Sequence, residues 1–78
     1  MDKIIVVVKE RWVLIGEKVA GNDTGVELTN ASAIRRWGTE RGLGQIAVAG
    51  VTPETVLDFC GDVTVPQTAI LYTIRCLK

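Results

Sequence analysis

The hydrophobic residues of this chain gather in short β-prone runs that polar turns separate. Residues 3–9 carry Ile and Val without alternation, the pattern of a central strand covered on both faces. Residues 12–20 form a second run, in which Gly16 indicates a bulge or sharp bend, and a hairpin should join the two runs. Turn-forming residues fill positions 21–25, and positions 26–29 alternate strictly. This predicts a third strand with one face toward solvent.

Two later segments allow more than one interpretation. Residues 31–37 are either a helical turn or a strand ending at Gly38, and the β-patterned surroundings favour the strand. Residues 52–60 begin with a Thr-Pro pair that is typical of a helix start. Alternation over residues 55–59, with many β-formers, instead favours a strand there.

A helical pattern lies between these two segments. Leu43, Ile46 and Ala47 stand at positions i, i+3 and i+4. Glycine is the residue that most often ends a helix. The spacing therefore predicts one to two helical turns that begin near Gly42 and stop at Gly50.

The end of the chain again shows a β pattern. Gly61-Asp62 predicts a turn, and Pro66 should restrict residues 63–65 to the edge of a sheet because proline cannot donate a ladder hydrogen bond. Residues 67–76 predict a closing strand whose apolar face consists of Ile70, Tyr72, Ile74 and Cys76.

Five or six short strands with one helical turn predict a single mainly β domain over residues 1–78, a small barrel of the SH3-like or OB-like kind. No apolar stretch approaches the length of a membrane-spanning helix, so we expect no membrane partner and a cytoplasmic location. The hydrophobic fraction is 47%, with a mean hydropathy of +0.28. So small an interior cannot hide that much apolar surface, which predicts a homo-oligomer.

Charge and chemistry argue against most enzymes. Nine basic and nine acidic residues cancel, which disfavours nucleic acid as a partner. The chain has no histidine, the commonest general base and metal ligand. Asp58 and Asp62 look like ordinary loop and strand-edge charges, and Cys60 lacks a base to activate it. We expect no catalysis, no cofactor and no metal site, and we expect Cys60 and Cys76 to be buried free thiols.

One cluster of residues suggests ligand binding. Arg35, Arg36 and Arg41 stand against the single Glu40, with Trp37 among them. Guanidinium groups hold phosphate in a bidentate manner, a glycine-rich turn can expose backbone N–H groups, and an indole offers a flat face for a base. The candidate ligand-binding residues are Arg35, Arg36, Trp37, Gly38, Thr39, Arg41, Gly42 and Gly44. Equally, Trp37 could belong to a core or interface, with the arginines as a solvated rim.

Residues 34–39, 42–47 and Gly50 carry a resemblance to known proteins. They are similar to a family of small uncharacterised proteins from bacteriophages, prophages and gut bacteria, with the pattern Arg-x-Trp-Gly-Thr, two residues, then Gly-Leu-Gly-x-Ile-Ala. The likeness continues to Thr-Val-Leu-Asp at residues 55–58. This chain departs from the pattern at residues 51–53, where relatives often place Gly-Pro-Thr directly. The resemblance implies a phage-type origin and no assigned activity.

Together these features predict a non-enzymatic phage-type protein that captures a small anionic, nucleotide-like ligand, for example to sequester a host signalling nucleotide and antagonise host defence. The alternative is an interaction or inhibitor module that docks on a host or virion protein through its Arg/Trp surface, because both residue types are enriched at binding hot spots. The sequence leaves open the identity of the ligand, the size of the oligomer and the choice between these two functions.

Overall fold

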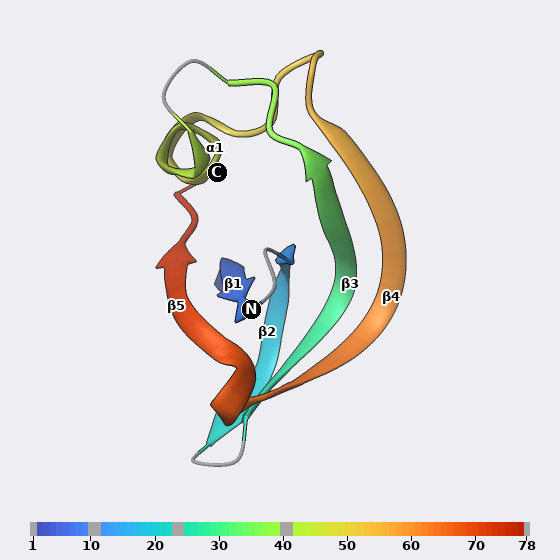
Figure 1. Ribbon diagram of the computed structural model, residues 1–78, viewed down its shortest axis with the longest axis vertical. Helices are drawn as coiled ribbons and strands as arrows, with labels where there is room; N and C mark the ends of the chain where they lie inside the picture. Colours follow the sequence, from blue (N-terminus) through green and yellow to red (C-terminus); the bar gives the residue numbers. More distant parts are fainter. Residues whose placement is uncertain (1, 10–11, 23–24, 40–41, 78) are drawn as a thin grey trace.

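The fold is one antiparallel sheet with a short helix packed on it (Figure 1). The computed structural model describes residues 2–9, 12–22, 25–39 and 42–77. Five strands lie in the order β4-β3-β2-β1-β5. The elements are β1 (Asp2–Val8), β2 (Val13–Asn22), β3 (Gly25–Arg36), α1 (Leu43–Ala49), β4 (Val56–Pro66), the 3₁₀ turn η2 (Gln67–Ala69) and β5 (Ile70–Arg75).

Strand β1 lies at the centre of the core. It pairs with β2 on one side and β5 on the other, and residues 4–8 are all buried. Because side chains alternate along a strand, these residues supply two faces. Ile5 and Val7 contact the cluster that includes α1, whereas Ile4, Val6 and Val8 belong to a second cluster. The prediction of a central strand covered on both faces is confirmed.

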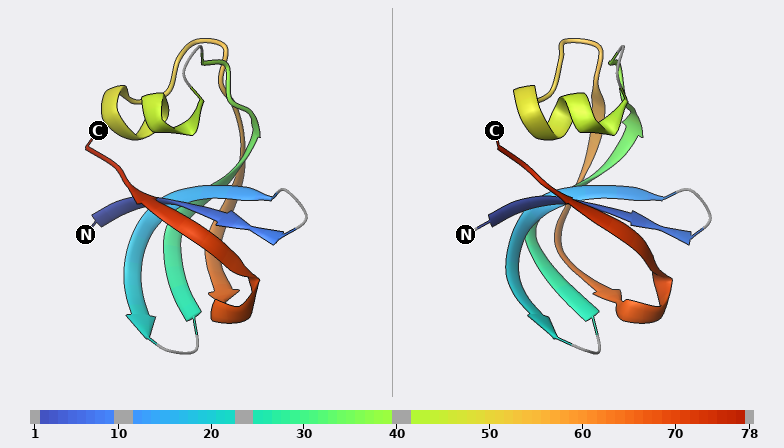
Figure 2. Two further views of the ribbon diagram at one scale, coloured as in Figure 1. Left: turned by 60° about the vertical axis from the view of Figure 1, so that its left-hand side comes forward. Right: turned by 90° about the vertical axis from the view of Figure 1, so that its left-hand side faces the viewer.

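The two faces are covered by different parts of the chain. We call the face with Ile5 and Val7 the helix face and the face with Ile4, Val6 and Val8 the curl face. The helix α1 lies over the helix face, and the long strands β2, β3 and β4 bend around the other side (Figure 2). On the helix face the buried residues are Ile5, Val7, Val13, Ile15, Ile34, Leu43, Ile46 and Ala47. On the curl face they are Ile4, Val6, Val8, Val26, Leu28, Ala31 and Val65.

The predicted hairpin of β1 and β2 is present, and so is the bulge at Gly16. The pairing of β2 with β3 shifts register between Ile15 and Glu17. A Cβ atom on Gly16 would come within 2.9 Å of the Cα of Ala31. Only glycine lets β3 approach β2 this closely, so the residue is explained by packing.

Residues 31–36 are a strand, as favoured above, but they continue the strand predicted over 26–29. Together they form β3, which is 12 residues long. Asn30 joins the two parts with a φ of 50°, beside shifts in register with β4. Asparagine tolerates this left-handed conformation better than most residues, so the strand can bend without ending.

The predicted helix is confirmed as α1, from Leu43 to Ala49. Leu43, Ile46 and Ala47 are the buried side chains. Gly50 has a φ of 88°, and its N–H donates to the Ile46 carbonyl at 2.8 Å, which ends the helix. The Thr-Pro pair that follows forms a turn, and the strand interpretation of the segment after it is confirmed by β4.

The predicted turn at Gly61-Asp62 is wrong. Strand β4 runs through both residues to Pro66, with a register irregularity near Cys60. Gly61 has a φ of 88° and lies opposite Ala31. A positive φ suits a bulge as well as a turn, and here it bends a strand that β3 holds in place. The edge position predicted from Pro66 is confirmed, because β4 is the last strand of the sheet.

The closing strand is shorter than predicted, and its apolar residues do not all lie on one face. Residues 67–69 form η2, so β5 begins at Ile70. Tyr72 lies opposite Val7, but Ile70 lies opposite Val8, which makes Leu71 the extra residue of a bulge. Ile70 therefore packs on the curl face and Ile74 on the helix face. The prediction that they share one face is wrong.

Strands β4 and β5 stand at the two ends of the sheet, and no pairing joins them in the described parts of the chain. The chain is thus mainly β, with one five-stranded sheet and one short helix. Both cysteines are free thiols, as expected. Cys76 is half-buried, whereas Cys60 is exposed on the β4 edge, so the predicted burial of Cys60 is wrong. Within the described segments, no helix is long and apolar enough to cross a bilayer.

Candidate functional site

The candidate arginines lie at the end of β3. Arg35 Nη2 donates to Asp58 Oδ1 on β4 at 3.0 Å, and both side chains are exposed. An exposed pair of this kind stabilises a fold by only about 0 to 1 kcal/mol because water and salt screen it. Arg36 is the last residue of β3, opposite Val56, and it is also exposed. Arg35 and Arg36 are therefore both presented at the same end of the sheet.

Trp37 follows directly after β3 and is 44% exposed. One side of its indole lies against Gly42, where a Cβ atom would stand 3.5 Å from the Trp37 Cζ3 atom. The Trp37 carbonyl accepts a 2.7 Å hydrogen bond from the hydroxyl of Thr55. The ring is thus partly supported and partly open to solvent.

Threonine hydroxyls hold the described residues of the loop that follows Trp37. Thr52 Oγ1 donates to the Gly38 carbonyl at 2.6 Å, and Thr39 Oγ1 donates to the Gly42 carbonyl at 2.9 Å. Gly38 has a φ of 64°, and a Cβ atom there would lie 2.3 Å from the backbone of Glu54. Glycine at this position is required by the close approach of two backbones. We call residues 35–39 with Gly42 the Arg/Trp corner.

Two of the candidate residues, Gly44 and Arg41, are not placed at this corner by the structure. Gly44 is exposed on α1, and a Cβ atom there would meet nothing within 4 Å. Arg41, with its neighbour Glu40, lies outside the described residues. The structure thus brings Trp37, Gly38, Thr39 and Gly42 together in one loop. It directs Arg35 toward Asp58 rather than toward that loop.

Sequence reasoning missed the two threonines that hold the corner. Thr52 and Thr55 lie 14 and 18 residues from the carbonyls that they bind. Their own mutual contact, with 3.2 Å between the hydroxyl oxygens, closes the turn before β4. A threonine-rich turn is a weak signal in sequence, because threonine serves many turns without reaching a distant loop.

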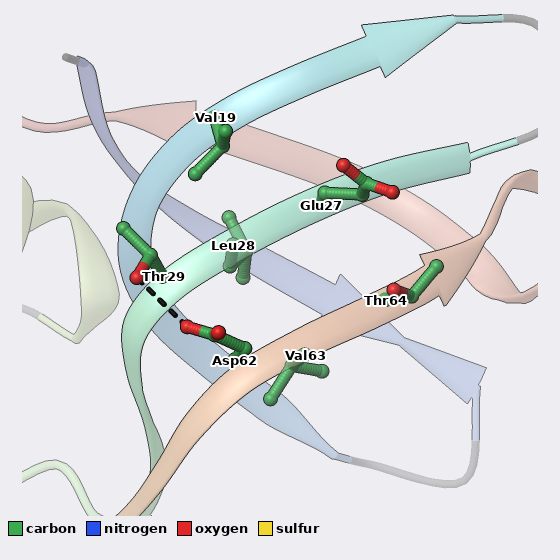
Figure 3. Close-up of a pocket in the computed structure, with 7 residues that line it drawn as sticks. All are labelled: Val19, Glu27, Leu28, Thr29, Asp62, Val63 and Thr64. Atoms are coloured by element: carbon green, nitrogen blue, oxygen red, sulfur yellow. Dashed lines mark hydrogen bonds between the residues drawn. The ribbon is translucent and has the colours of Figure 1, made fainter.

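A hollow of about 520 Å³ on β3 and β4 was also missed (Figure 3). Asp62 Oδ1 accepts a 2.8 Å hydrogen bond from Thr29 Oγ1 there. The carboxylates of Asp62 and Glu27 both belong to this hollow, which makes it unsuitable for an anion. It is lined by Val19, Glu27, Leu28, Thr29, Asp62, Val63 and Thr64. None of the predicted ligand-binding residues is among them.

Groups for catalysis are sparse in the described parts of the chain. No set of three His, Cys, Asp or Glu side chains is placed to hold a metal ion within those segments. Burial raises the pKa of the Cys76 thiol above its ordinary value of 9.0, and the positive charge of Lys3 partly opposes this. At neutral pH that thiol stays protonated, which makes it a poor nucleophile.

Comparisons of the chain with protein-family models, with curated proteins and with solved structures found no match.

Proposed function

We propose that this chain is a non-enzymatic, phage-type binding protein that captures a small anionic, nucleotide-like ligand at the Arg/Trp corner. The observation that supports this proposal is the half-exposed indole of Trp37, held on a loop fixed by threonine hydroxyls beside two exposed arginines. A fixed loop loses little conformational entropy when a ligand binds. The indole would stack on a base, and the guanidinium groups would bind phosphate.

The expected affinity depends on how many of these groups act together. A charge-assisted hydrogen bond contributes about 1.5 to 3 kcal/mol, and a stacked base about 1 to 3 kcal/mol. Micromolar binding requires about 8 kcal/mol. Both arginines and the indole must therefore contribute, and Arg35 has to share its guanidinium between Asp58 and the ligand. Loss of any one group, worth about 1 to 3 kcal/mol, should weaken the binding about 5- to 150-fold.

The biological role would be sequestration of a host signalling nucleotide in the cytoplasm of an infected bacterium. Sequestration requires affinity and copy number but no turnover, which fits a chain that contains no histidine. The same proposal includes an SH3-like or OB-like barrel and a homo-oligomer. The strongly bent strands β2, β3 and β4 and the exposed apolar residues support these two points.

Calorimetric titration with mono-, di- and cyclic nucleotides tests the proposal. We expect saturable heat with at least one of them at about 100 μM protein, well above a micromolar dissociation constant. The Arg36→Lys variant should bind at least about tenfold more weakly, because lysine cannot form the bidentate contact. Arg75→Lys, at an exposed arginine on β5, is the matched control and should bind like the unchanged protein. Heat with no nucleotide would overturn the proposal.

A second candidate is a protein interaction module that uses the same surface. It is favoured by the ion pair of Arg35 with Asp58, because an arginine that is already paired is less available for phosphate. The exposed Trp37 with polar residues around it has the usual composition of a binding hot spot. Here Trp37→Ala should abolish capture of a host or virion protein, and Arg36→Lys should change it little. The opposite order of effects supports the nucleotide proposal.

A further inference from the structure

Strand β4 leaves one long edge of the sheet open. It is 11 residues long, and among the residues that the structure describes it pairs with β3 on one side only. Monomeric proteins protect such edges with charged side chains, especially lysine, with proline, with β-bulges or by covering them. Here no lysine occurs in β4, and its proline is the last residue of the strand. Leu57 and Phe59 are instead 40% and 74% exposed beside this edge.

The two acidic side chains of β4 are drawn back onto β3. Asp58 accepts its hydrogen bond from Arg35, and Asp62 accepts one from Thr29. Arg35 and Thr29 both belong to β3. The carboxylates are therefore held toward the strand's own sheet, and the edge stays free to form backbone hydrogen bonds.

The faces of β4 follow from its pairing with β3. Phe59 lies opposite Ser32, which is opposite Ile15 of the helix face. Asp58 lies opposite Ala33, on the other face. After the bulge the odd-numbered residues lie on the curl face instead of the helix face, because Val63 lies opposite the curl-face residue Leu28. Asp62 and Phe59 thus share the helix face although they are three positions apart.

We propose that β4 pairs antiparallel with β4 of a second copy of this chain, about a two-fold axis between Cys60 and Gly61. In this register Phe59 lies opposite Asp62 of the other copy, Asp58 opposite Val63 and Leu57 opposite Thr64. In each pair the two side chains lie on the same face of the sheet, both before and after the bulge. A register shifted by one residue would place side chains of opposite faces against each other. No two carboxylates lie opposite each other.

The exposed surface supports an interface of this kind. The chain exposes 5200 Å², whereas a folded monomer of 8.5 kDa exposes about 4650 Å² on average. The excess is about 550 Å², and a standard interface buries about 800 Å² on each partner. A second copy has the complementary faces by symmetry, so the pairing joins two five-stranded sheets into one continuous sheet.

Mass measurement by light scattering, with two matched variants, tests the proposal. We expect unchanged protein at about 100 μM to have at least twice the chain mass of 8.5 kDa. Phe59→Lys places a charge at the β4 interface and should reduce the mass at least twofold. Leu71→Lys is the control, because Leu71 is 59% exposed on the opposite edge strand β5, and it should leave the mass unchanged. Circular dichroism confirms that both variants fold.

Cross-linking through Cys60 tests the register itself. In a Cys76→Ser background, the two Cys60 residues flank the axis within about 7 Å, so mild oxidation should link them as a dimer. In a control with Cys60→Ser, Cys76→Ser and Thr64→Cys, the two introduced thiols lie seven positions apart, or about 24 Å, and should not link. The link should also be lost in Phe59→Lys.

A single-chain mass for the unchanged protein would overturn the proposal. So would a mass that falls with Leu71→Lys rather than Phe59→Lys, since the interface would then be on β5. Preferential linking at position 64 would show another register. The proposal does not rest on ligand capture, because nucleotide binding at the Arg/Trp corner is measured separately and its absence leaves these masses and cross-links unchanged.

Discussion

The centre of the sheet and its β4 edge contain similar apolar residues but use them differently. In β1, Ile5 and Val6 are completely buried, one against the helix face and the other against the curl face. In β4, Leu57 and Phe59 lie on the helix face, and both are exposed. Apolar residues at the centre therefore stabilise the fold, whereas those at the edge are available for contacts with other molecules.

The largest difference between the regions should appear when a side chain is truncated. Ile5→Ala removes a fully buried side chain and leaves a cavity, so we expect the free energy of unfolding to fall by about 2 to 5 kcal/mol. Phe59→Ala removes a larger side chain that is mostly in solvent. Its cost should stay below about 1 kcal/mol, measured by urea denaturation at a concentration where the chain is monomeric.

Equal costs for the two variants would contradict this comparison. A large cost for Phe59→Ala that grows with protein concentration would instead show that the edge is buried between copies. Measurement of both variants at two protein concentrations distinguishes these outcomes.

The second prediction compares two glycines on either side of Gly42. Gly38→Ala forces a Cβ atom against the backbone of Glu54 at a φ of 64°, so we expect a loss of about 1 to 3 kcal/mol. Gly44→Ala adds a methyl group to an exposed helix position with nothing within 4 Å. It should stabilise the protein by about 0.5 to 1 kcal/mol. Thermal unfolding of both variants checks the opposite signs, and a loss in both would refute the packing role assigned to Gly38.

Burial explains which parts of the fold the sequence predicts. The run from Ile4 to Val8 must satisfy two apolar faces, and α1 must bury Leu43 and Ile46 on one side, so both leave a periodic pattern. Gly61 carries no such information. A glycine with positive φ occurs in turns and in bulges alike, and only the pairing with Ala31 distinguishes them.

The candidate site was predictable only in part, for a related reason. Arg35, Arg36 and Trp37 are adjacent in sequence, so the end of one strand was enough to place these three together. The supports of the corner come from Thr52 and Thr55, and the hollow at Asp62 requires Thr29, 33 residues away. Such contacts depend on the register between β3 and β4. Because both strands contain bulges, the sequence alone does not predict that register.

The third prediction concerns the hydroxyls that hold the corner. Thr52→Val removes the donor to the Gly38 carbonyl while it keeps the shape of the side chain. The substitution also removes the acceptor of the Glu54 N–H and the contact with the Thr55 hydroxyl. We expect a loss of about 1 to 2 kcal/mol, because one hydrogen bond contributes about 0.5 to 1.5 kcal/mol and more than one is lost. Thr68→Val, at an exposed position in η2, is the control and should cost less than about 0.5 kcal/mol. A smaller cost for Thr52→Val than for Thr68→Val would show that the loop is not fixed by its threonine.

The smallest effect is expected for the ion pair that links the Arg/Trp corner to the β4 edge. A double-mutant cycle with Arg35→Ala and Asp58→Ala should give a coupling energy of about 0.2 to 1 kcal/mol, because both side chains are exposed. The coupling should decrease in 0.5 M salt, where the screening length is only a few ångströms. A coupling above about 2 kcal/mol that resists salt would mean that water is excluded from the pair. A second molecule covering the corner would do this, and the edge and the corner would then act as one surface.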